Sequence, residues 1–146
     1  MKTSLTLLTA GILSALSSAS VQASDIVISG VVDGPLPGGY PKAVELYVVN
    51  DIDDLSAYGV GSANNGGGSD GEEFTFPAEA AVAGSHIYVA TDIDGFTEFF
   101  GFAPEFTSGA LAVNGDDAIE LFQDGNVIDT FGQIDVDGSG TEWDYL

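Results

Sequence analysis

The chain has 146 residues, of which 23 are Asp or Glu and only two, Lys2 and Lys42, are basic, so its formal charge is −21. It has no Cys, which excludes disulfide scaffolds, Cys-ligated metal centres and thiol catalysis, and it has a single His, His86. Direct binding to DNA, RNA or an anionic membrane surface is not expected, because that affinity rests on Lys and Arg. The chain is 45% hydrophobic and 10% aromatic, which is too apolar for a disordered acidic tail, so we expect one folded domain.

Residues 1–23 have the composition of a secretory signal peptide. Lys2 gives a short basic start, residues 5–15 are apolar, and Val21-Gln22-Ala23 resembles a small-residue cleavage site. The apolar run is shorter than the roughly 20 residues that span a bilayer, so a membrane anchor is the weaker alternative. We therefore expect residues 1–23 to be removed, residues 24–146 to form the domain, and the protein to be secreted or periplasmic without a membrane span.

Short segments of alternating apolar and polar residues follow the signal. They predict strands over residues 26–32, 42–50, 74–76, 86–90, 118–122 and 127–131. Asp124-Gly125-Asn126 predicts a hairpin turn, and residues 94–100 one short turn of helix. Residues 33–41 and 61–71 are rich in Gly and are expected to be loops. This pattern is typical of an all-β sandwich or barrel.

Candidates for catalysis are few. His86 begins a predicted strand, and a single His is more often structural than a general base. A nucleophilic Ser would need His86 or Lys42 as its base. A hydrolase with paired carboxylates is formally available to a chain with 23 acids, but the sequence selects no pair. We expect no catalytic residue, and a small carboxylate-based hydrolase is the least favoured alternative.

Bound Ca²⁺ is the cofactor that this composition favours, since Ca²⁺ takes clustered carboxylate and amide oxygens. Four short clusters qualify: residues 51–54, 92–95, 114–117 and 135–140. The last has the spacing of the first half of an EF-hand loop, with Asp135, Asp137 and Ser139 as candidate ligands. Its twelfth position is Leu146 rather than Glu, so an EF-hand is excluded and an irregular Ca²⁺ loop is left. The alternative is that these clusters are turns in which Asp and Asn bond their own backbone.

The aromatic residues suggest a second kind of ligand. A flat face for sugar rings could be formed by Tyr40, Tyr47, Tyr58, Tyr88, Trp143 and Tyr145, although aromatic residues more simply fill a core. The partner is accordingly an unidentified protein or glycan. Most of the acids are expected at outward strand positions and in turns, where they keep the surface solvated.

The order of several motifs resembles the bacterial, secreted branch of the lamin-tail domain family. The matching stretches are DIVISGVV (25–32), KAVELY (42–47), DLSAY (54–58), YVA (88–90), NGDDAIEL (114–121), VIDTFGQIDV (127–136) and GTEWDY (140–145). The resemblance implies an immunoglobulin-like β-sandwich without a catalytic set, often attached to an extracellular nuclease or other hydrolase as an accessory module. It also implies structural roles for Glu45, Asp54, Asp116, Asp117 and Asp129. Related chains continue after the W-x-Y-L segment with a short segment that carries another Trp and an Arg, whereas this sequence stops at Leu146. The alternatives are a domain truncated at its C-terminal edge and the front of a longer gene product with an attached catalytic domain.

Overall fold

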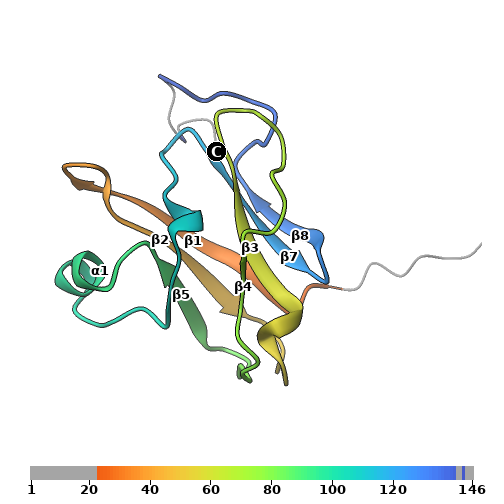
Figure 1. Cartoon of the computed structure of the whole chain (residues 1–146). Coiled ribbons are helices and arrows are strands. Elements are labelled where there is room, and N and C mark those ends of the chain that lie inside the picture. Colours follow the sequence, from red (N-terminus) through yellow and green to blue (C-terminus); the bar gives the residue numbers. More distant parts are fainter. Residues whose placement is uncertain (1–22, 141–142, 144–146) are drawn as a thin grey trace, which may run out of the picture.

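The structure, a computed structural model, describes residues 23–140 and Trp143 and forms a β-sandwich of two four-stranded sheets (Figure 1). The first sheet has the order β1-β2-β5-β6 and the second the order β4-β3-β7-β8. All pairings are antiparallel except that of β5 with β6. The strands are β1 Ile26–Leu36, β2 Tyr40–Val48, β3 Tyr58–Ala63, β4 Phe74–Thr75, β5 His86–Ala90, β6 Phe106–Thr107, β7 Ala118–Gln123 and β8 Asn126–Phe131.

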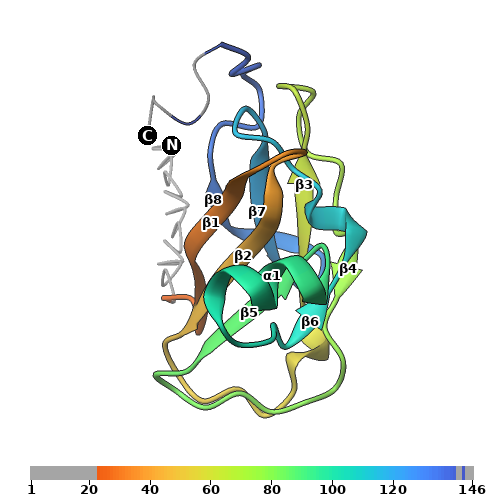
Figure 2. The same ribbon diagram turned by 90° about the vertical axis from the view of Figure 1, so that its left-hand side faces the viewer.

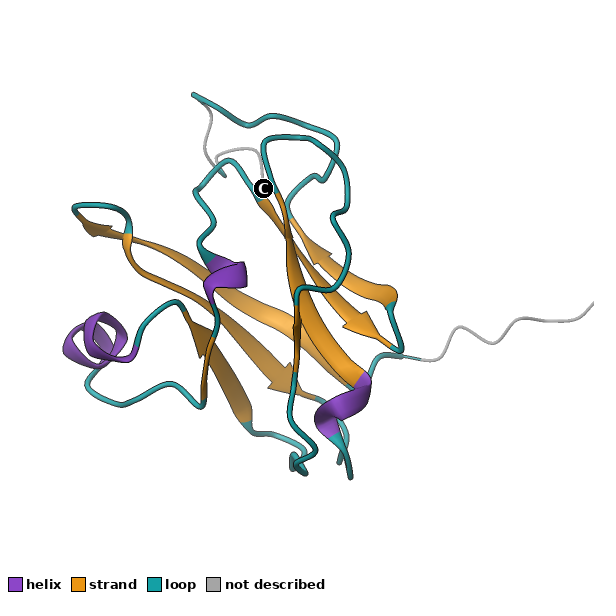
Figure 3. Ribbon diagram, in the orientation of Figure 1, coloured by secondary structure: helices purple, strands orange, loops and turns teal. Residues whose placement is uncertain are grey.

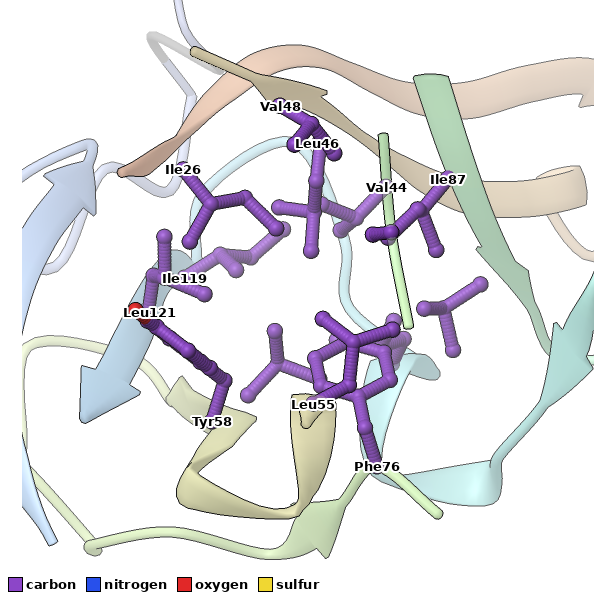
Figure 4. Packing of buried hydrophobic residues seen from close by; sticks show 14 of the residues in the cluster. Ile26, Val44, Leu46, Val48, Leu55, Tyr58, Phe76, Ile87, Ile119 and Leu121 are labelled. Carbon is purple, nitrogen blue, oxygen red and sulfur yellow. The ribbon is translucent and has the colours of Figure 1, made fainter. Parts of the chain in front are cut away.

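Alternating apolar side chains from both sheets meet in one core (Figure 4). On β2 the residues Val44, Leu46 and Val48 are fully buried, and on β7 Ile119 and Leu121 face them. This is the period-two pattern of a half-buried strand, in which every second side chain leaves water. Two short helical turns, Leu55–Ala57 (η1) and Gly109–Leu111 (η2), add the buried Leu55 and Leu111 to the core, and η2 lies between the two sheets (Figure 3).

The six predicted strands are confirmed, but the prediction of a loop over residues 33–41 is wrong. Strands β1 and β2 continue through this segment and leave only residues 37–39 as the turn between them. Gly38 and Gly39 have φ values of 88° and 73°, which lets the chain reverse within these residues. The hairpin turn between β7 and β8 is confirmed, because Asp124 and Gly125 both have positive φ, as a two-residue turn of this kind requires.

Strand β3 is not among the predicted strands, because its sequence YGVGSA looks like part of the Gly-rich loop that follows. It is buried along its whole length. A Cβ on Gly59 would meet the Glu72 carboxylate at 2.3 Å, and one on Gly61 would meet the Gly71 carbonyl oxygen at 2.2 Å. The two glycines therefore allow the residues after the loop to lie directly on the outer face of the second sheet.

The predicted helical turn is longer than expected and forms α1, Ile93–Phe100, which lies over the outer face of the first sheet (Figure 2). Asp92 caps its first turn by accepting a hydrogen bond from the Gly95 N–H at 2.6 Å. Its buried Phe96 packs with Ala43, Ala90 and Tyr88 in a second, smaller core. Among the described residues there is no helix with the length and apolarity to cross a membrane.

Candidate functional site

Lys42 is the only Lys or Arg among the described residues, and it is buried between the two sheets. Its Nζ donates to Asp33 Oδ1 at 2.6 Å, to the Val113 carbonyl oxygen at 2.5 Å and to Asn114 Oδ1 at 3.3 Å. The other oxygen of Asp33 accepts the Gly115 N–H at 3.1 Å. This ion pair ties the β1–β2 hairpin to the loop before β7, so the only strong base of the described chain is committed to the fold.

Asp117, in the N-G-D-D motif, holds the same loop from its other side. Its carboxylate is buried and accepts the N–H of Asn65 at 2.9 Å and that of Asn114 at 2.7 Å. Trp143 Nε1 donates to the Asp117 carbonyl oxygen at 2.9 Å. Asp116 is half-buried beside it. The motif thus joins the loop after β3 to the start of β7.

Two further carboxylates of the resemblance also accept backbone N–H groups. Asp129 on β8 accepts the Ile28 N–H of β1 at 2.8 Å, which links the neighbouring edges of the two sheets. Asp54 accepts the Ser56 N–H at 2.9 Å and caps η1. Hydrogen bonds from Ser56 also lower the pKa of Asp54 below its ordinary value. Both side chains therefore stabilise the ends and edges of elements.

Glu45 differs from these residues because its carboxylate lies on the outer face of the first sheet, among side chains rather than backbone donors. Ser29 Oγ donates to Glu45 Oε1 at 2.7 Å, and His86 Nε2 lies 3.9 Å from the same oxygen. Burial raises the pKa of Glu45, but hydrogen bonds from the Ser29 and Tyr88 hydroxyls and the nearby His86 outweigh that effect, so its pKa lies below the ordinary 4.5. Glu45 is consequently ionised at neutral pH.

The Ser29, Glu45 and His86 side chains do not form a nucleophile–base–acid triad. The carboxylate stands between the other two groups, and Ser29 bonds to it directly. In a hydrolytic triad the imidazole must touch the hydroxyl in order to remove its proton, and the carboxylate must lie behind the imidazole. This arrangement has the members in the wrong order for that chemistry.

Aromatic rings continue from this point across the outer face. Tyr47 and His86 have ring centroids 5.2 Å apart, and His86 stacks near Tyr88 at 6.4 Å. Tyr88 in turn contacts Phe96 at 5.7 Å and Phe102 at 5.0 Å. The outer face of β1, β2 and β5 together with α1 is hereafter called the aromatic face. At its centre the Glu45 carboxylate lies beside aromatic rings and the Ser29 and Tyr88 hydroxyls.

Only two of the six aromatic candidates from the sequence lie on this face, namely Tyr47 and Tyr88. Tyr58 is buried in the core, where its hydroxyl accepts a hydrogen bond from Gln123 and burial raises its pKa. Tyr40 lies at the end of the β1–β2 hairpin, and Trp143 packs against Phe131 at 5.3 Å. Tyr145 lies outside the described residues. The five candidates that the structure describes therefore do not form one continuous surface.

The Ca²⁺ candidates lie in the loop that follows β8. Asp137 Oδ1 accepts the Ser139 N–H at 3.0 Å, which is a local Asx turn. Asp135 lies beside Gly68 of the Gly-rich loop. Over residues 23–140 and 143 there is no group of three or more His, Asp or Glu side chains that could hold a metal ion. Asp54, Asp92 and Asp117, from the other three clusters, likewise accept backbone N–H groups.

Two more acids bear on the hydrolase alternative. Glu105 lines an open cavity of about 270 Å³ next to Glu79 and His86, but its Oε2 accepts the Tyr88 N–H at 2.8 Å. Glu120 on β7 points outward in the strand pattern, yet it is buried, and its Oε2 has no hydrogen-bond partner. The expectation that acids lie mainly on the surface is thus wrong for Glu120, as it is for Asp117.

Searches with protein-family models, among curated proteins and among solved structures found no match to this chain.

Sequence reasoning does not reveal the part played by Lys42, Ser29 and the Phe residues of α1. Lys42 stands out in the sequence as the last base of the chain, and it is in phase with the buried Val44 and Leu46 of the same strand, but nothing in the sequence identifies the acceptors that let a charged side chain be buried there. The run FTEFFGF at residues 96–102 is the available signal for an aromatic cluster, because four Phe within seven residues exceed what one short helix can bury.

Proposed function

We infer that this protein is a secreted, non-catalytic binding module of the lamin-tail type, with an immunoglobulin-like sandwich. The observation that carries the proposal is the use made of the motif carboxylates. Asp54, Asp117 and Asp129 each accept a backbone N–H, and Asp33 neutralises Lys42. Carboxylates that hold loops and sheet edges through these hydrogen bonds are not free to activate water.

The positions of Lys42 and His86, the two basic side chains of the described residues, support the same view. Lys42 is buried in an ion pair, and the geometry about His86 places a carboxylate between it and Ser29. Nucleophilic and acid–base catalysis both need a base in contact with the group that it deprotonates. The aromatic face carries exposed apolar side chains instead, and such surfaces are typical of protein or ligand recognition.

The module would act beside an extracellular hydrolase, either in the same gene product or as a separate protein. Its acidic surface would repel nucleic acid, so its contribution would be to position or attach the enzyme rather than to grip a phosphate backbone. The Ca²⁺-stabilised domain and the carboxylate hydrolase stay alternatives that no contact of the described residues favours.

A hydrolysis assay tests the proposal. The protein is incubated with DNA, a phosphomonoester and aryl glycosides, in the presence of Ca²⁺ or Mg²⁺, beside the Glu120→Gln and Glu105→Gln variants. The proposal expects no turnover above that of a buffer control in any sample. Reproducible turnover by the wild type that either substitution abolishes would overturn it.

A further inference from the structure

The aromatic face contains a small cavity between α1 and the first sheet. It has a volume of about 120 Å³ and is mostly apolar. Gly30, Ala43, Glu45, Tyr88 and Phe100 are among the residues that line it. Gly30 lies directly beside the Glu45 side chain, since a Cβ built on it would be 3.4 Å from Glu45 Cβ and 3.7 Å from Glu45 Oε1. Glu45 contributes the one carboxylate of the lining.

That carboxylate lacks a strong cationic partner. The only Lys or Arg of the described chain, Lys42, is bound to Asp33 between the sheets. His86 lies 3.9 Å from Glu45 and is substantially exposed, with 43% of its side chain accessible. An ionised carboxylate in a half-buried, apolar setting is stabilised most strongly by an opposite charge close to it. A cation that enters the cavity therefore gains both this attraction and the faces of aromatic rings, which attract cations.

The size of the cavity indicates which cation fits. At about 120 Å³ it is far smaller than the roughly 300–1,000 Å³ of a site for a whole small molecule, so one slender side chain suits it best. A lysine side chain has four heavy atoms beyond Cβ, whereas an arginine side chain has six. Arginine also favours a carboxylate with both oxygens free for a forked pair, and Ser29 already occupies Glu45 Oε1. A lysine side chain, with its methylenes against apolar walls and its ammonium at the carboxylate, matches this lining.

The surroundings of the cavity favour a lysine of a polypeptide over a free amine. The exposed fractions of Ile93, Phe99, Phe100 and Phe102 are 53%, 48%, 37% and 42%. The ring centroid of Phe100 lies 5.0 Å from that of Phe99 and 6.2 Å from that of Phe102, so the rings adjoin the cavity. Contiguous exposed aromatic side chains around a charged pocket are typical of a protein interface.

We propose that this cavity binds the lysine side chain of a partner protein, with Glu45 as the counter-ion and the exposed aromatic side chains as the surrounding contact. The inference rests on the proposed binding function and names its partner chemistry. A partner that presents a lysine between apolar residues fits the site, and the strongly negative charge of the chain would speed its approach.

The test is an NMR titration of the ¹⁵N-labelled protein in salt of about 150 mM, which screens non-specific attraction. Two capped ligands are used: lysine methylamide, and a peptide with one lysine flanked by phenylalanines. The same peptide with norleucine in place of lysine is the matched control. The lysine peptide is expected to shift the amide signals of Gly30, Ala43 and Gly101. It should bind at least tenfold more tightly than either the norleucine peptide or the capped lysine.

Three variants decide the assignment. Glu45→Gln keeps the shape and the acceptor for Ser29 but removes the charge, so it should weaken the lysine peptide at least tenfold. Gly30→Val fills the cavity and should do the same if Glu45→Gln fails to fold. Glu98→Gln removes one charge from the exposed side of α1 and should change the affinity less than twofold.

Each outcome has one meaning. The lysine site would be overturned if the lysine and norleucine peptides bound with equal affinity. It would also be overturned if neither Glu45→Gln nor Gly30→Val weakened the lysine peptide, or if the chemical-shift changes mapped to another part of the surface. Equal affinities for capped lysine and the peptide would overturn the polypeptide partner. These outcomes concern binding alone, so the proposed non-catalytic function would stand. Turnover in the hydrolysis assay would instead overturn that function whatever binds in the cavity.

Discussion

The ion pair between Lys42 and Asp33 should be one of the most sensitive points of the fold. Lys42→Met keeps nearly the length of the side chain and removes its charge. It leaves the Asp33 carboxylate with only the Gly115 N–H and leaves the Val113 carbonyl oxygen without the Lys42 donor. Removing one member of a buried pair costs about 3–5 kcal/mol. The Asp33 side chain is 24% exposed, so water relieves part of that cost and the lower half of the range applies.

Urea denaturation measures this effect. With an m-value of about 2 kcal/mol/M, the midpoint should fall by about 1.5–2 M in the Lys42→Met variant. Asp33→Asn should lower the free energy of unfolding by less than Lys42→Met does, because the side-chain amide oxygen of the variant would still accept a hydrogen bond from Lys42. The double variant should lose clearly less stability than the sum of the two single losses, since it has neither charge of the pair. The coupling free energy between the two positions should be about 1–3 kcal/mol. A loss below about 0.5 kcal/mol for Lys42→Met, as for a surface residue, or strictly additive losses, would refute the reasoning.

Three further predictions concern single carboxylates. Asp129→Ala should cost about 1–2 kcal/mol and speed hydrogen exchange of the Ile28 amide, whereas unchanged exchange would contradict the link between the sheet edges. Glu120→Met should raise the free energy of unfolding by about 1 kcal/mol, because it removes a buried oxygen that has no hydrogen-bond partner; a lower midpoint in urea denaturation would argue against this. Since the pKa of Glu45 is lowered in the fold, its contribution is present above pH 4.5 and is lost as pH falls through the lowered pKa. The Tm difference between wild type and Glu45→Gln should shrink from about pH 6 to about pH 3, and a constant difference would disprove that origin.

The fold class is accessible from the sequence because strands with one buried face repeat every two residues. Val44, Leu46 and Val48 show that repeat without interruption. β3 is not predicted in this way, because Gly59 and Gly61 interrupt its alternating pattern. Both glycines are required because residues 71–74 come close to them on the outer face. That approach is a tertiary fact, and no local pattern encodes it.

The site is less accessible than the fold. Glu45 is identified through a motif, but its neighbours come from other segments. Ser29 lies 16 residues before it, and His86 and Tyr88 lie on β5, which pairs with β2 at those positions. These contacts depend on which strands pair and in which register, and that pairing cannot be predicted from the pattern of a single sequence. The acceptors that allow Lys42 to be buried are equally hidden, because one of them, the Val113 carbonyl oxygen, lies 71 residues away.

The motif carboxylates of this chain stabilise the fold by accepting backbone N–H groups, and Asp117→Asn tests this most directly. Each oxygen of the Asp117 carboxylate accepts one backbone N–H, from Asn65 and from Asn114. An amide side chain at this position would turn its NH₂ group toward one of these donors. The free energy of unfolding at pH 7 should therefore fall by about 2–4 kcal/mol, since hydrogen bonds to charged groups contribute ~1.5–3 kcal/mol each, while the exposed Glu98→Gln changes it by less than about 0.5 kcal/mol. Equal stability of Asp117→Asn and the wild type would contradict the account.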